Sequence, residues 1–355
     1  MKLHLSLPAV LFSAVACRLV WSSAAVDDDC YNSTYAILMA QTQGTQDFIL
    51  CPNTTIDVGV PANPQFTDFV NGDFPLVILG DNVTVQCGSD GSSKNNCVLN
   101  GGFIQLVATP NNPLFPGTLT SNDLRIQGLT FSGTLQGPPG FGDTVAATAV
   151  SLGSVGTNMI LEDCIFSNLS AYQTVFLGND PLSSPEDLLP MQSSLIISNS
   201  VFTDVMYEGQ VIHVDQQTLT LHGTRLDRIR KQDCGCNASY LLYVEDGSMT
   251  IEDSSISNVE VLTSVVGVYG NKTEFSTSGL AVTETTIINK DSRPEDDYCE
   301  KGVIMEREAN GGFDECLLLG DSTDDETSAC GPALVWPALA GVVIATAATC
   351  FGIWI

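Results

Sequence analysis

One twelve-residue pattern recurs six times between residues 124 and 291, and this repeat limits the possible folds more than any other feature of the chain. In each copy the first and third places are apolar, the fifth is Gly, Asp, Asn or Glu, and the eighth is Phe, Leu or Ile. The copies begin at Leu124, Met159, Leu195, Leu219, Met249 and Leu280. Apolar residues two places apart are typical of a half-buried strand, and the fifth place suits a turn. Each copy therefore predicts a strand, a turn and a second strand.

A further short apolar stretch follows most copies and predicts one more strand in each unit. These stretches are 149–152, 174–177, 211–214, 241–244, 265–268 and 303–305. A unit of two or three strands cannot bury its own inner face, so successive units must stack with equivalent strands paired. The repeat therefore predicts an all-β fold, a right-handed parallel β-helix over residues 76–310 with an N-terminal cap region over 26–75.

The repeat resembles that of the right-handed parallel β-helix proteins of the pectin-lyase-like superfold. The run Phe48-Ile-Leu-Cys-Pro-Asn-Thr-Thr55 and residues 83–102, which include Cys87 and Cys97, look like the cap and first coil of secreted β-helix proteins from unicellular algae. The resemblance covers about residues 30–310 and implies the fold. It implies no particular activity, because the superfold includes lyases, hydrolases, esterases, adhesins and proteins with no assigned role.

Both ends of the chain predict targeting segments. Residues 1–25 carry Lys2, an apolar run and small residues at 23–25, which is typical of a cleaved secretory signal peptide. The residues before Cys17 also resemble a bacterial lipoprotein box, which is the alternative at this end. Residues 333–355 are apolar throughout and follow an acidic juxtamembrane linker at 311–332.

No Lys or Arg follows Arg307, which favours a GPI attachment signal, with small residues at 320–322 or 328–330 as the attachment site. A single transmembrane helix is the alternative, because the apolar stretch is long enough to span a bilayer. Either form predicts a protein held through its C-terminal tail or lipid anchor at the extracellular side of the plasma membrane.

Cysteines and glycosylation sequons agree with secretion. Spacing favours disulfides between Cys30 and Cys51 and between Cys87 and Cys97, and it leaves the partners of Cys234, Cys236, Cys299 and Cys316 open. Cys164 occupies an inner place of the repeat and predicts a buried free thiol. The Cys234–Cys236 pair lacks a second ligand pair at zinc spacing, so no metal site is predicted. The expected glycosylation sites are Asn32, Asn53, Asn82, Asn237 and Asn271.

A sixth sequon, at Asn168, falls at the tenth place of the repeat, which Gly, Asn and Asp dominate. The residues at this place are Gly133, Asn168, Asp204, Arg228, Asn258 and Asn289. We interpret them as a row of turns and expect Asn168 to carry no glycan.

The acidic charge of the chain argues against nucleic acid as its partner. The chain has 13 Lys and Arg against 41 Asp and Glu, whereas binding to a phosphate backbone needs a basic face. More than half of the acidic excess lies in residues 26–75 and 291–326, outside the coils. We interpret it as a solvated collar that holds the rod off an anionic bilayer. Phosphate-binding glycine loops, EF-hand loops and Ser or Cys triads are absent from the sequence, so no cofactor is predicted.

The fourth place of the repeat points outward and offers the best acid–base pair, His222 beside Glu252. This row reads Gln127, Glu162, Ser198, His222, Glu252 and Thr283. Together with Arg228, the pair is the candidate catalytic set. Polygalacturonases carry Asn-Thr-Asp, Asp-Asp, Gly-His-Gly and Arg-Ile-Lys motifs. Here His222-Gly223 and Arg228-Ile229-Arg230-Lys231 are similar, but they share one copy and no Asn-Thr-Asp precedes them. Solvated side chains on a sheet face are the alternative interpretation.

Two further sets of residues are candidate ligand contacts. The basic cluster Arg225, Arg228, Arg230 and Lys231 could bind a uronate or sulfated sugar, or it could pair with neighbouring carboxylates such as Asp227. The outward row of the following strand reads Ser151, Phe176, His213, Tyr243, Gly267 and Ile304. Phe176, His213 and Tyr243 in this row predict an aromatic ladder that either packs against sugar rings or lies under a loop.

The sequence therefore predicts a cell-surface β-helix glycoprotein without enzymatic activity, which contacts extracellular polysaccharide or protein. The alternative is a polysaccharide lyase or glycoside hydrolase that uses residues 222–231. A purely structural component of a wall or coat is the third class.

Overall fold

The computed structural model describes residues 30–62, 69–108, 123–137, 147–152, 157–178, 193–232, 239–270, 273–288, 304–307 and 313–317. In the last two of these ranges it describes the backbone alone. The predicted signal peptide, the apolar tail and most of the acidic linker lie outside the described residues. So do Cys234, Cys236, Cys299, Asn237 and Asn271.

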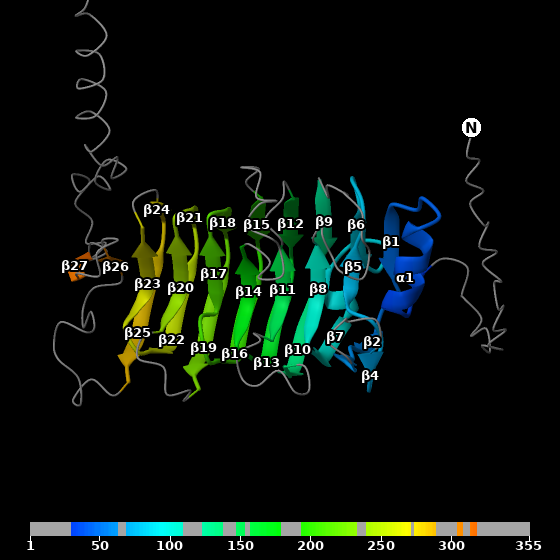
Figure 1. The fold of residues 1–355 in the computed structure, drawn as a ribbon, viewed down its shortest axis with the longest axis horizontal. Helices are drawn as coiled ribbons and strands as arrows, with labels where there is room; N and C mark the ends of the chain where they lie inside the picture. Colours follow the sequence, from blue (N-terminus) through cyan, green and yellow to red (C-terminus); the bar gives the residue numbers. More distant parts are fainter. Residues whose placement is uncertain are drawn as a thin grey trace, which may run out of the picture.

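Three long sheets run along the molecule, and Figure 1 shows their strands side by side from the N-terminal to the C-terminal end. Sheet A contains β1 (Asp47–Leu50), β6 (Thr84–Cys87), β9 (Leu124–Gln127), β12 (Asn158–Glu162), β15 (Ser194–Ser198), β18 (Thr218–His222), β21 (Ser248–Glu252) and β24 (Glu274–Ser278). Sheet B contains β2 (Thr55–Asp57), β7 (Cys97–Gly102), β10 (Leu129–Leu135), β13 (Ile165–Ala171), β16 (Val201–Tyr207), β19 (Arg225–Lys231), β22 (Ser255–Val261) and β25 (Ala281–Ile287). Sheet C contains β5 (Leu76–Ile78), β8 (Ile104–Ala108), β11 (Thr148–Leu152), β14 (Gln173–Leu177), β17 (Ile212–Asp215), β20 (Tyr240–Glu245), β23 (Ser264–Tyr269), β26 (Ile304–Arg307) and β27 (Phe313–Leu317).

The chain visits sheets A, B and C in turn, so each circuit adds one parallel strand to each sheet. Leu195 pairs with Met159 on one side and with Leu219 on the other, which is the register that the repeat predicts. Only the last pair in sheet C, β26 with β27, is antiparallel among the described strands of the three sheets. The fold is a parallel β-helix, and the prediction of this fold class is confirmed.

The sixth copy of the repeat lies five residues earlier than the sequence predicted. Met249 pairs with Phe275, and Ile256 pairs with Val282, so the copy begins at Phe275 and not at Leu280. Leu280 and Val282 alternate like the first and third places and so imitate the start of a copy. The backbone decides between the two registers, because the left-handed Gly279 takes the turn place that Asp253 takes one rung before.

Two rows of left-handed residues shape every rung from the third onward. The fifth-place row forms the corner between sheets A and B, with φ between 46° and 69° at Gly128, Asp163, Asn199, Gly223, Asp253 and Gly279. The tenth-place row interrupts the strands of sheet B, with positive φ at Gly133, Asn168, Asp204, Arg228, Asn258 and Glu284. Gly, Asn and Asp tolerate this conformation best, which explains the composition of both rows. Glu284 replaces the predicted Asn289, because the last register is shifted.

The core fills the interior of the coil with aliphatic and aromatic ladders. Phe131, Phe166 and Phe202, at the eighth place, are fully buried and stack with ring centroids 4.7 and 4.2 Å apart. Leu161, Ile197, Leu221 and Ile251 form a second buried ladder from sheet A. Because each rung contributes one side chain to each ladder, burial of any rung depends on its two neighbours.

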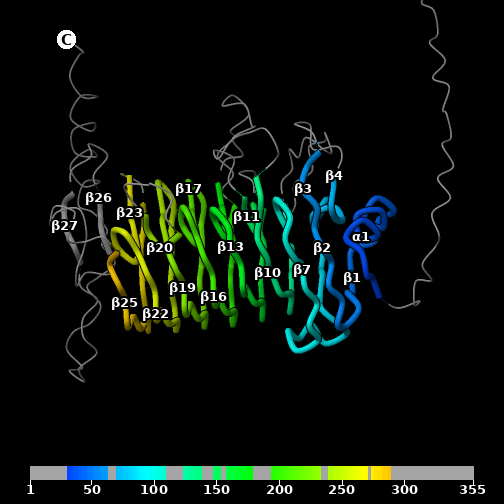
Figure 2. The backbone as a smooth tube through the Cα atoms, turned by 90° about the horizontal axis from the view of Figure 1, so that it is seen from below, coloured from blue at the N-terminus to red at the C-terminus, as the bar shows by residue number. Residues whose placement is uncertain are grey.

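The N-terminal end of the coil is closed on all three sheets. Helix α1 (Thr34–Gln41) packs beside β5, Tyr31 pairs with Leu50 of β1, and Asp73 pairs with Val58 after β2. Asp73 also accepts hydrogen bonds from the Ser33 hydroxyl at 2.7 Å and the Thr34 amide at 3.0 Å, so it fixes the start of α1. Figure 2 shows α1 at the blue end of the stacked coils. The strands β1 and β2, which lie within the range predicted as the cap region, form the first strands of sheets A and B.

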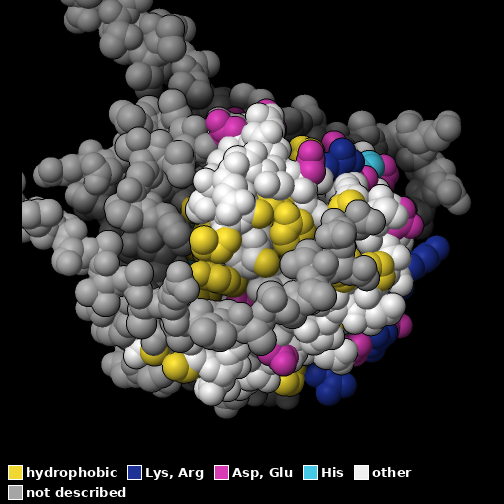
Figure 3. All heavy atoms as spheres, turned by 90° about the vertical axis from the view of Figure 1, so that its right-hand side faces the viewer, with side chains coloured by type: hydrophobic (Ala, Val, Ile, Leu, Met, Phe, Trp, Pro, Cys, Tyr) yellow, Lys and Arg dark blue, Asp and Glu magenta, His cyan; other side chains and the backbone are white. Residues whose placement is uncertain are grey.

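The outer surface of the cap carries exposed apolar side chains. Tyr35, Met39 and Val70 are each exposed by about two fifths. Figure 3 views this end of the molecule and shows apolar side chains gathered near its middle. A two-stranded sheet of β3 (Val60–Pro61) and β4 (Phe69–Val70) belongs to the same region, and a short 3-10 helix, η1 (Ser93–Asn95), precedes β7.

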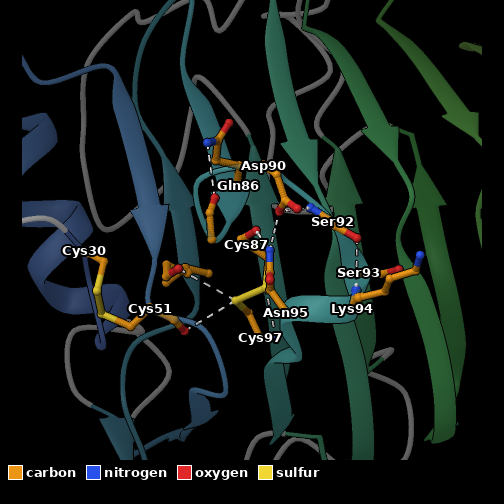
Figure 4. Close-up of a disulfide and its surroundings, with 12 residues drawn as sticks. Cys30, Cys51, Gln86, Cys87, Asp90, Ser92, Ser93, Lys94, Asn95 and Cys97 are labelled. Carbon is orange, nitrogen blue, oxygen red and sulfur yellow. Dashed lines mark hydrogen bonds between the residues drawn. A yellow bond between two sulfur atoms is a disulfide. The ribbon is translucent and has the colours of Figure 1, made fainter.

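Both predicted disulfides are present, and Figure 4 shows them in neighbouring parts of the first rungs. Cys30–Cys51 ties the cap to the end of β1, and Cys87–Cys97 joins the strands β6 and β7. Cys164 is a buried free thiol, as predicted. No helix within the described residues is long and apolar enough to cross a membrane.

Candidate functional site

The predicted acid–base pair forms on the outer face of sheet A. His222 pairs with Glu252 in register, and its Nδ1 lies 3.5 Å from the Glu252 Oε2. Both side chains are 48% exposed, so water surrounds the contact. Thr283, predicted in the same row, is replaced by Ser278 because of the shifted last register.

Arg228 does not join this pair, because it lies on sheet B and is bound to carboxylates there. Its Nε and Nη2 donate to the two carboxylate oxygens of Asp204, each at 2.8 Å, and its Nη1 donates to Asp227 at 2.7 Å. Asp227 in turn accepts from Ser257 and Asn258, both at 2.9 Å. The fork of Arg228 holds the pKa of Asp204 below its ordinary value. Arg228 is therefore the centre of an ion-pair network across three rungs.

The predicted basic cluster divides into two parts. Lys231 is buried, lies 5.6 Å from the centre of the Tyr207 ring, and donates to the backbone carbonyls of Glu208 and Gln232. Arg225 and Arg230 are exposed. The two arginines are therefore the cations of the cluster that remain accessible to a ligand.

The aromatic row on sheet C has the predicted register but lies half-buried. Phe176, His213 and Tyr243 pair on successive rungs, and each neighbouring pair of rings meets edge to face at about 5 Å. Gly267 continues the row, and the Tyr240 ring occupies the space where a Cβ at residue 267 would lie. Burial lowers the pKa of His213 to about 4, so its imidazole is neutral at pH 7. The predicted Ile304 is replaced by Met305.

Sequence reasoning missed two carboxylates that share this face of sheet C. Asp215 and Glu245 lie two residues after His213 and Tyr243, pair with each other in register, and are half-buried. Burial raises the pKa of both, and negative neighbours add to it, Asp246 for Asp215 and Asp215 for Glu245. The Tyr243 hydroxyl donates to Glu245 at 3.4 Å. The sequence could have identified both carboxylates, because side chains two places apart in a strand lie on the same face of the sheet.

Replacing Asp215 with Asn is expected to stabilise the fold at pH 7. A raised pKa means that the native state holds the proton more tightly than the unfolded chain, so stability falls as pH rises above the ordinary value of 3.8 through the native pKa. The gain of Asp215→Asn should therefore be present at pH 7 and disappear near pH 4 in urea titrations. Asp204→Asn is the matched control, and it should lower the stability at pH 7 instead of raising it, because Arg228 lowers the pKa of Asp204. A loss of stability for Asp215→Asn at pH 7 would contradict the assignment.

The outer face of sheet A carries exposed side chains on several rungs, which alternate with buried ones along each strand. Its strands pair edge to edge over eight rungs, which spans roughly 34 Å at about 4.8 Å per rung. Hydroxyl side chains hydrogen-bond along the rows, as Ser248 does to Thr218 and Thr250 to Ser276, each at 3.1 Å. Ile160 and Ile196 pair in register within one row and are exposed by 37% and 38%.

Charged side chains border this apolar pair. Arg125 donates to Glu162, and Gln127 donates to the same carboxylate at 2.8 Å. The arginine contact lowers the pKa of Glu162. The face therefore offers hydroxyl rows, an apolar pair and a neutralised charge pair.

The three described sequons of the expected glycosylation set are on the surface. Asn32, Asn53 and Asn82 are all exposed, and the last two have left-handed backbones in turns. Asn168 is in the tenth-place row within β13, as predicted. Groups of His, Cys, Asp and Glu that could hold a metal ion are absent from the described part of the chain.

Comparison with known proteins adds little to this description. No protein-family profile matches the chain, and no curated protein matches it. Among solved structures, tailspike protein 3 of bacteriophage CBA120 is similar at 10% identity and a TM-score of 0.18, over 83% of this chain and 61% of that chain. The chain thus spans about three fifths of the tailspike's length. The assignment to the class of parallel β-helix proteins rests on the register of the three sheets.

Proposed function

We propose that the chain is a cell-surface β-helix glycoprotein without enzymatic activity, which contacts a neutral extracellular polysaccharide through the outer face of sheet A. The observation that carries this proposal is the set of exposed side chains on this face, with its hydroxyl contacts and the exposed Ile160–Ile196 pair. Sheet C is less suitable, because its aromatic row is half-buried and partly overlaid by Tyr240.

The chemistry of the face matches a sugar polymer. Ser and Thr hydroxyls both donate and accept hydrogen bonds, as sugar hydroxyls do, and the exposed isoleucines provide apolar surface for the C–H faces of sugar rings. Hydroxyls on neighbouring rungs, such as Thr218 with Ser248 and Thr250 with Ser276, present similar contacts to successive units of a polymer. Many weak contacts along one chain then add up to useful avidity.

The charge of the protein favours a neutral polymer over an acidic one. The formal net charge is −28, which repels a polyuronate or a sulfated chain. Of the four cations in the basic cluster, Arg228 is held by two carboxylates and Lys231 by backbone carbonyls. Arg225 and Arg230 are the exposed cations of this cluster that such contacts leave to offset that repulsion.

We infer that the protein is not an enzyme from the positions of the three residues predicted to be catalytic. His222 and Glu252 are each about half exposed to water, and Arg228 is held by Asp204 and Asp227. General acid–base catalysis needs groups that converge on one reacting atom in a shielded site. These three residues do not converge.

Location at the cell surface is part of the same proposal. Two disulfides, exposed sequons, the signal-like residues 1–25 and the apolar residues 333–355 support it. Fractionation of cells that express the full chain with an internal tag tests it. The protein should be accessible to protease from outside intact cells, and a purely cytosolic protein would contradict the location.

Binding to immobilised neutral glucan is expected to weaken at least about tenfold in Ile196→Asp, which is about 1.4 kcal/mol. Met206→Asp is the matched control, because Met206 is 47% exposed on sheet B and the change adds the same charge. Affinity electrophoresis of the secreted chain against neutral glucan and polyuronate measures both. The proposal would fail if the two variants lost the same amount of affinity. It would also fail if the wild-type protein bound neither polysaccharide.

A second candidate function, glycoside hydrolysis, is favoured by the Asp215–Glu245 pair. Retaining glycosidases use two carboxyls about 5–5.5 Å apart, and residues paired on neighbouring strands are separated by about 4.8 Å at the backbone. The raised pKa of each carboxyl suits a general acid.

If the chain releases reducing ends from a polysaccharide, Asp215→Asn and Glu245→Gln should each lower the rate at least about a hundredfold. His222→Ala and Arg228→Ala should leave it unchanged. A reducing-sugar assay decides between the sites. Activity that survives in Glu245→Gln and is lost in His222→Ala would show that the catalytic residues lie on sheet A.

A further inference from the structure

Two half-buried carboxylates on sheet C have no cationic partner among the described residues. Asp215 and Glu245 pair in register on neighbouring rungs, which places their backbones about 4.8 Å apart. No ion pair that the described residues form includes either of them. His213, two places before Asp215, is neutral at pH 7 because burial lowers its pKa to about 4. The described part of the chain therefore places two negative charges side by side without a positive charge to balance them.

Partial burial makes this repulsion more costly. Burial raises the pKa of both carboxyls, and the charge of Asp246 raises that of Asp215 further. The pKa of a carboxyl rises when its surroundings compensate the charged form poorly, and either a proton or a bound cation can supply the missing charge. Proton binding weakens as the pH rises, so the advantage of a bound cation grows toward neutral pH.

An aromatic ring lies beside the carboxylates at the end of the row nearest Asp215. The residue that precedes Asp215 in this row is Gly178, because Leu177 pairs with Val214. A Cβ at residue 178 would lie 2.7 Å from the Phe176 ring and 3.2 Å from the Asp215 Cβ. The glycine thus leaves room for the ring, and the ring and the Asp215 side chain flank it on the same face of the sheet.

Tyrosines lie beside Glu245 in the same way. Tyr269 pairs with Glu245 in register and continues the row on the next rung. The Tyr243 hydroxyl donates to Glu245 at 3.4 Å from the row two places earlier. Aromatic rings attract a cation through their faces, and their apolar surface also suits the carbon atoms of an organic cation. The carboxylate pair is therefore set among groups that favour an organic cation.

The number of ligands argues against a metal ion. Groups of three or more His, Cys, Asp and Glu that could hold a metal are absent from the part of the chain that the structure describes. An ammonium group is satisfied differently, because its N–H groups donate hydrogen bonds and carboxylate oxygens accept them. The formal net charge of −28 also attracts cations to the protein.

We propose that Asp215, Glu245 and the rings that flank them form a binding site for a small organic cation with a primary ammonium group. The ammonium lies between the two carboxylates, and its carbon stem packs against the rings. The site uses the carboxylates of the second candidate function, but it requires neither catalysis nor a polysaccharide. Failure of this proposal would therefore leave binding through sheet A intact, and failure of that binding would leave this site intact.

Nuclear magnetic resonance of the secreted full chain with labelled tyrosines tests the site. The protein is titrated with n-butylammonium chloride at pH 7 and constant ionic strength, and n-butanol is the matched neutral ligand. We expect saturable shifts of the Tyr243 signal with n-butylammonium and at least about tenfold weaker binding of n-butanol. Equal binding of the two ligands would mean that the rings alone bind the carbon stem, and the proposal would fail. Tighter binding of calcium chloride than of n-butylammonium would also overturn it, because the carboxylates would then form a metal site.

Variants assign the binding to the carboxylates. The double variant Asp215→Asn, Glu245→Gln should bind n-butylammonium at least about tenfold more weakly. Both carboxyls have a raised pKa, so their replacement should not destabilise the fold at pH 7, and a loss of binding would not reflect unfolding.

The double variant Asp47→Asn, Glu274→Gln is the matched control. It removes the same charge from two exposed carboxylates on sheet A and should change the affinity by less than about twofold. Equal affinities of the sheet C variant and the wild type, or equal losses in the two double variants, would show that the ammonium does not bind at Asp215 and Glu245.

Discussion

Phe166→Ala is expected to lower the free energy of unfolding by about 3–5 kcal/mol, which is the largest effect that a single residue in this fold should show. Phe166 is fully buried, and its ring stacks between Phe131 on one rung and Phe202 on the next. Its removal leaves a cavity in the middle of the ladder, and both neighbouring rings lose a contact. Urea denaturation followed by far-ultraviolet circular dichroism measures the change.

Ser167→Ala is the matched control for this ladder. Ser167 is the next residue along β13, on the opposite face of the strand, and its replacement should change stability by no more than about 0.5 kcal/mol. Phe166→Leu should lie between the two variants, because it retains part of the packed volume. Equal effects of Phe166→Ala and Ser167→Ala would mean that residue 166 does not face the core.

Loss of the Cys87–Cys97 disulfide should have the second largest effect, about 3 kcal/mol from the cross-link alone. The bond closes a loop with a sequence separation of 10 residues, and the unfolded chain gains the corresponding freedom when it is removed. The double variant Cys87→Ala, Cys97→Ala removes the bond without leaving free thiols. Thermal denaturation measures the loss.

Cys164→Ala separates the cross-link from the packing of sulfur. Cys164 is as deeply buried as Cys87 and Cys97 but forms no disulfide, so its replacement reports the loss of a buried sulfur alone. The double variant should be clearly less stable than this control, even after the loss for Cys164→Ala is counted twice. A midpoint within error of the Cys164→Ala variant would show that the disulfide contributes little.

The sequence predicted most of the fold because every rung repeats the same physical requirements. The alternation at Leu195 and Ile197 and the turn at Asn199 set the register for one copy, and the same pattern sets it for its neighbours. The last copy was misplaced because Leu280 and Val282 imitate the start of a strand. Only pairing with Met249 and Ile256 resolves that ambiguity, and pairing is a property of the assembled coil.

The candidate site was less predictable, because its properties depend on contacts between rungs. The alternation of the strands predicts that Phe176, His213 and Tyr243 form one row. It does not predict that the Tyr240 ring lies over Gly267, the next residue of that row, and so covers part of it. Asp227, next to Arg228 in sequence, was recognised as a partner.

The stronger partner of Arg228 is Asp204, which lies one rung away at the same place of the repeat. Asp215 and Glu245 were overlooked because their chemistry arises from burial beside each other. Residues that are 30 positions apart in the sequence face each other across one rung spacing.

Footprinting of the bound protein tests the central functional claim most directly. The secreted chain is oxidised by hydroxyl radicals with and without saturating neutral glucan, and the modification of Ile160, Ile196 and Met206 is compared by mass spectrometry. All three side chains are exposed in the free protein, the isoleucines on sheet A and Met206 on sheet B. We predict protection of Ile160 and Ile196 with Met206 unchanged. Protection of Met206 alone, or of none of the three under conditions where the protein is retained on the glucan, would contradict binding through sheet A.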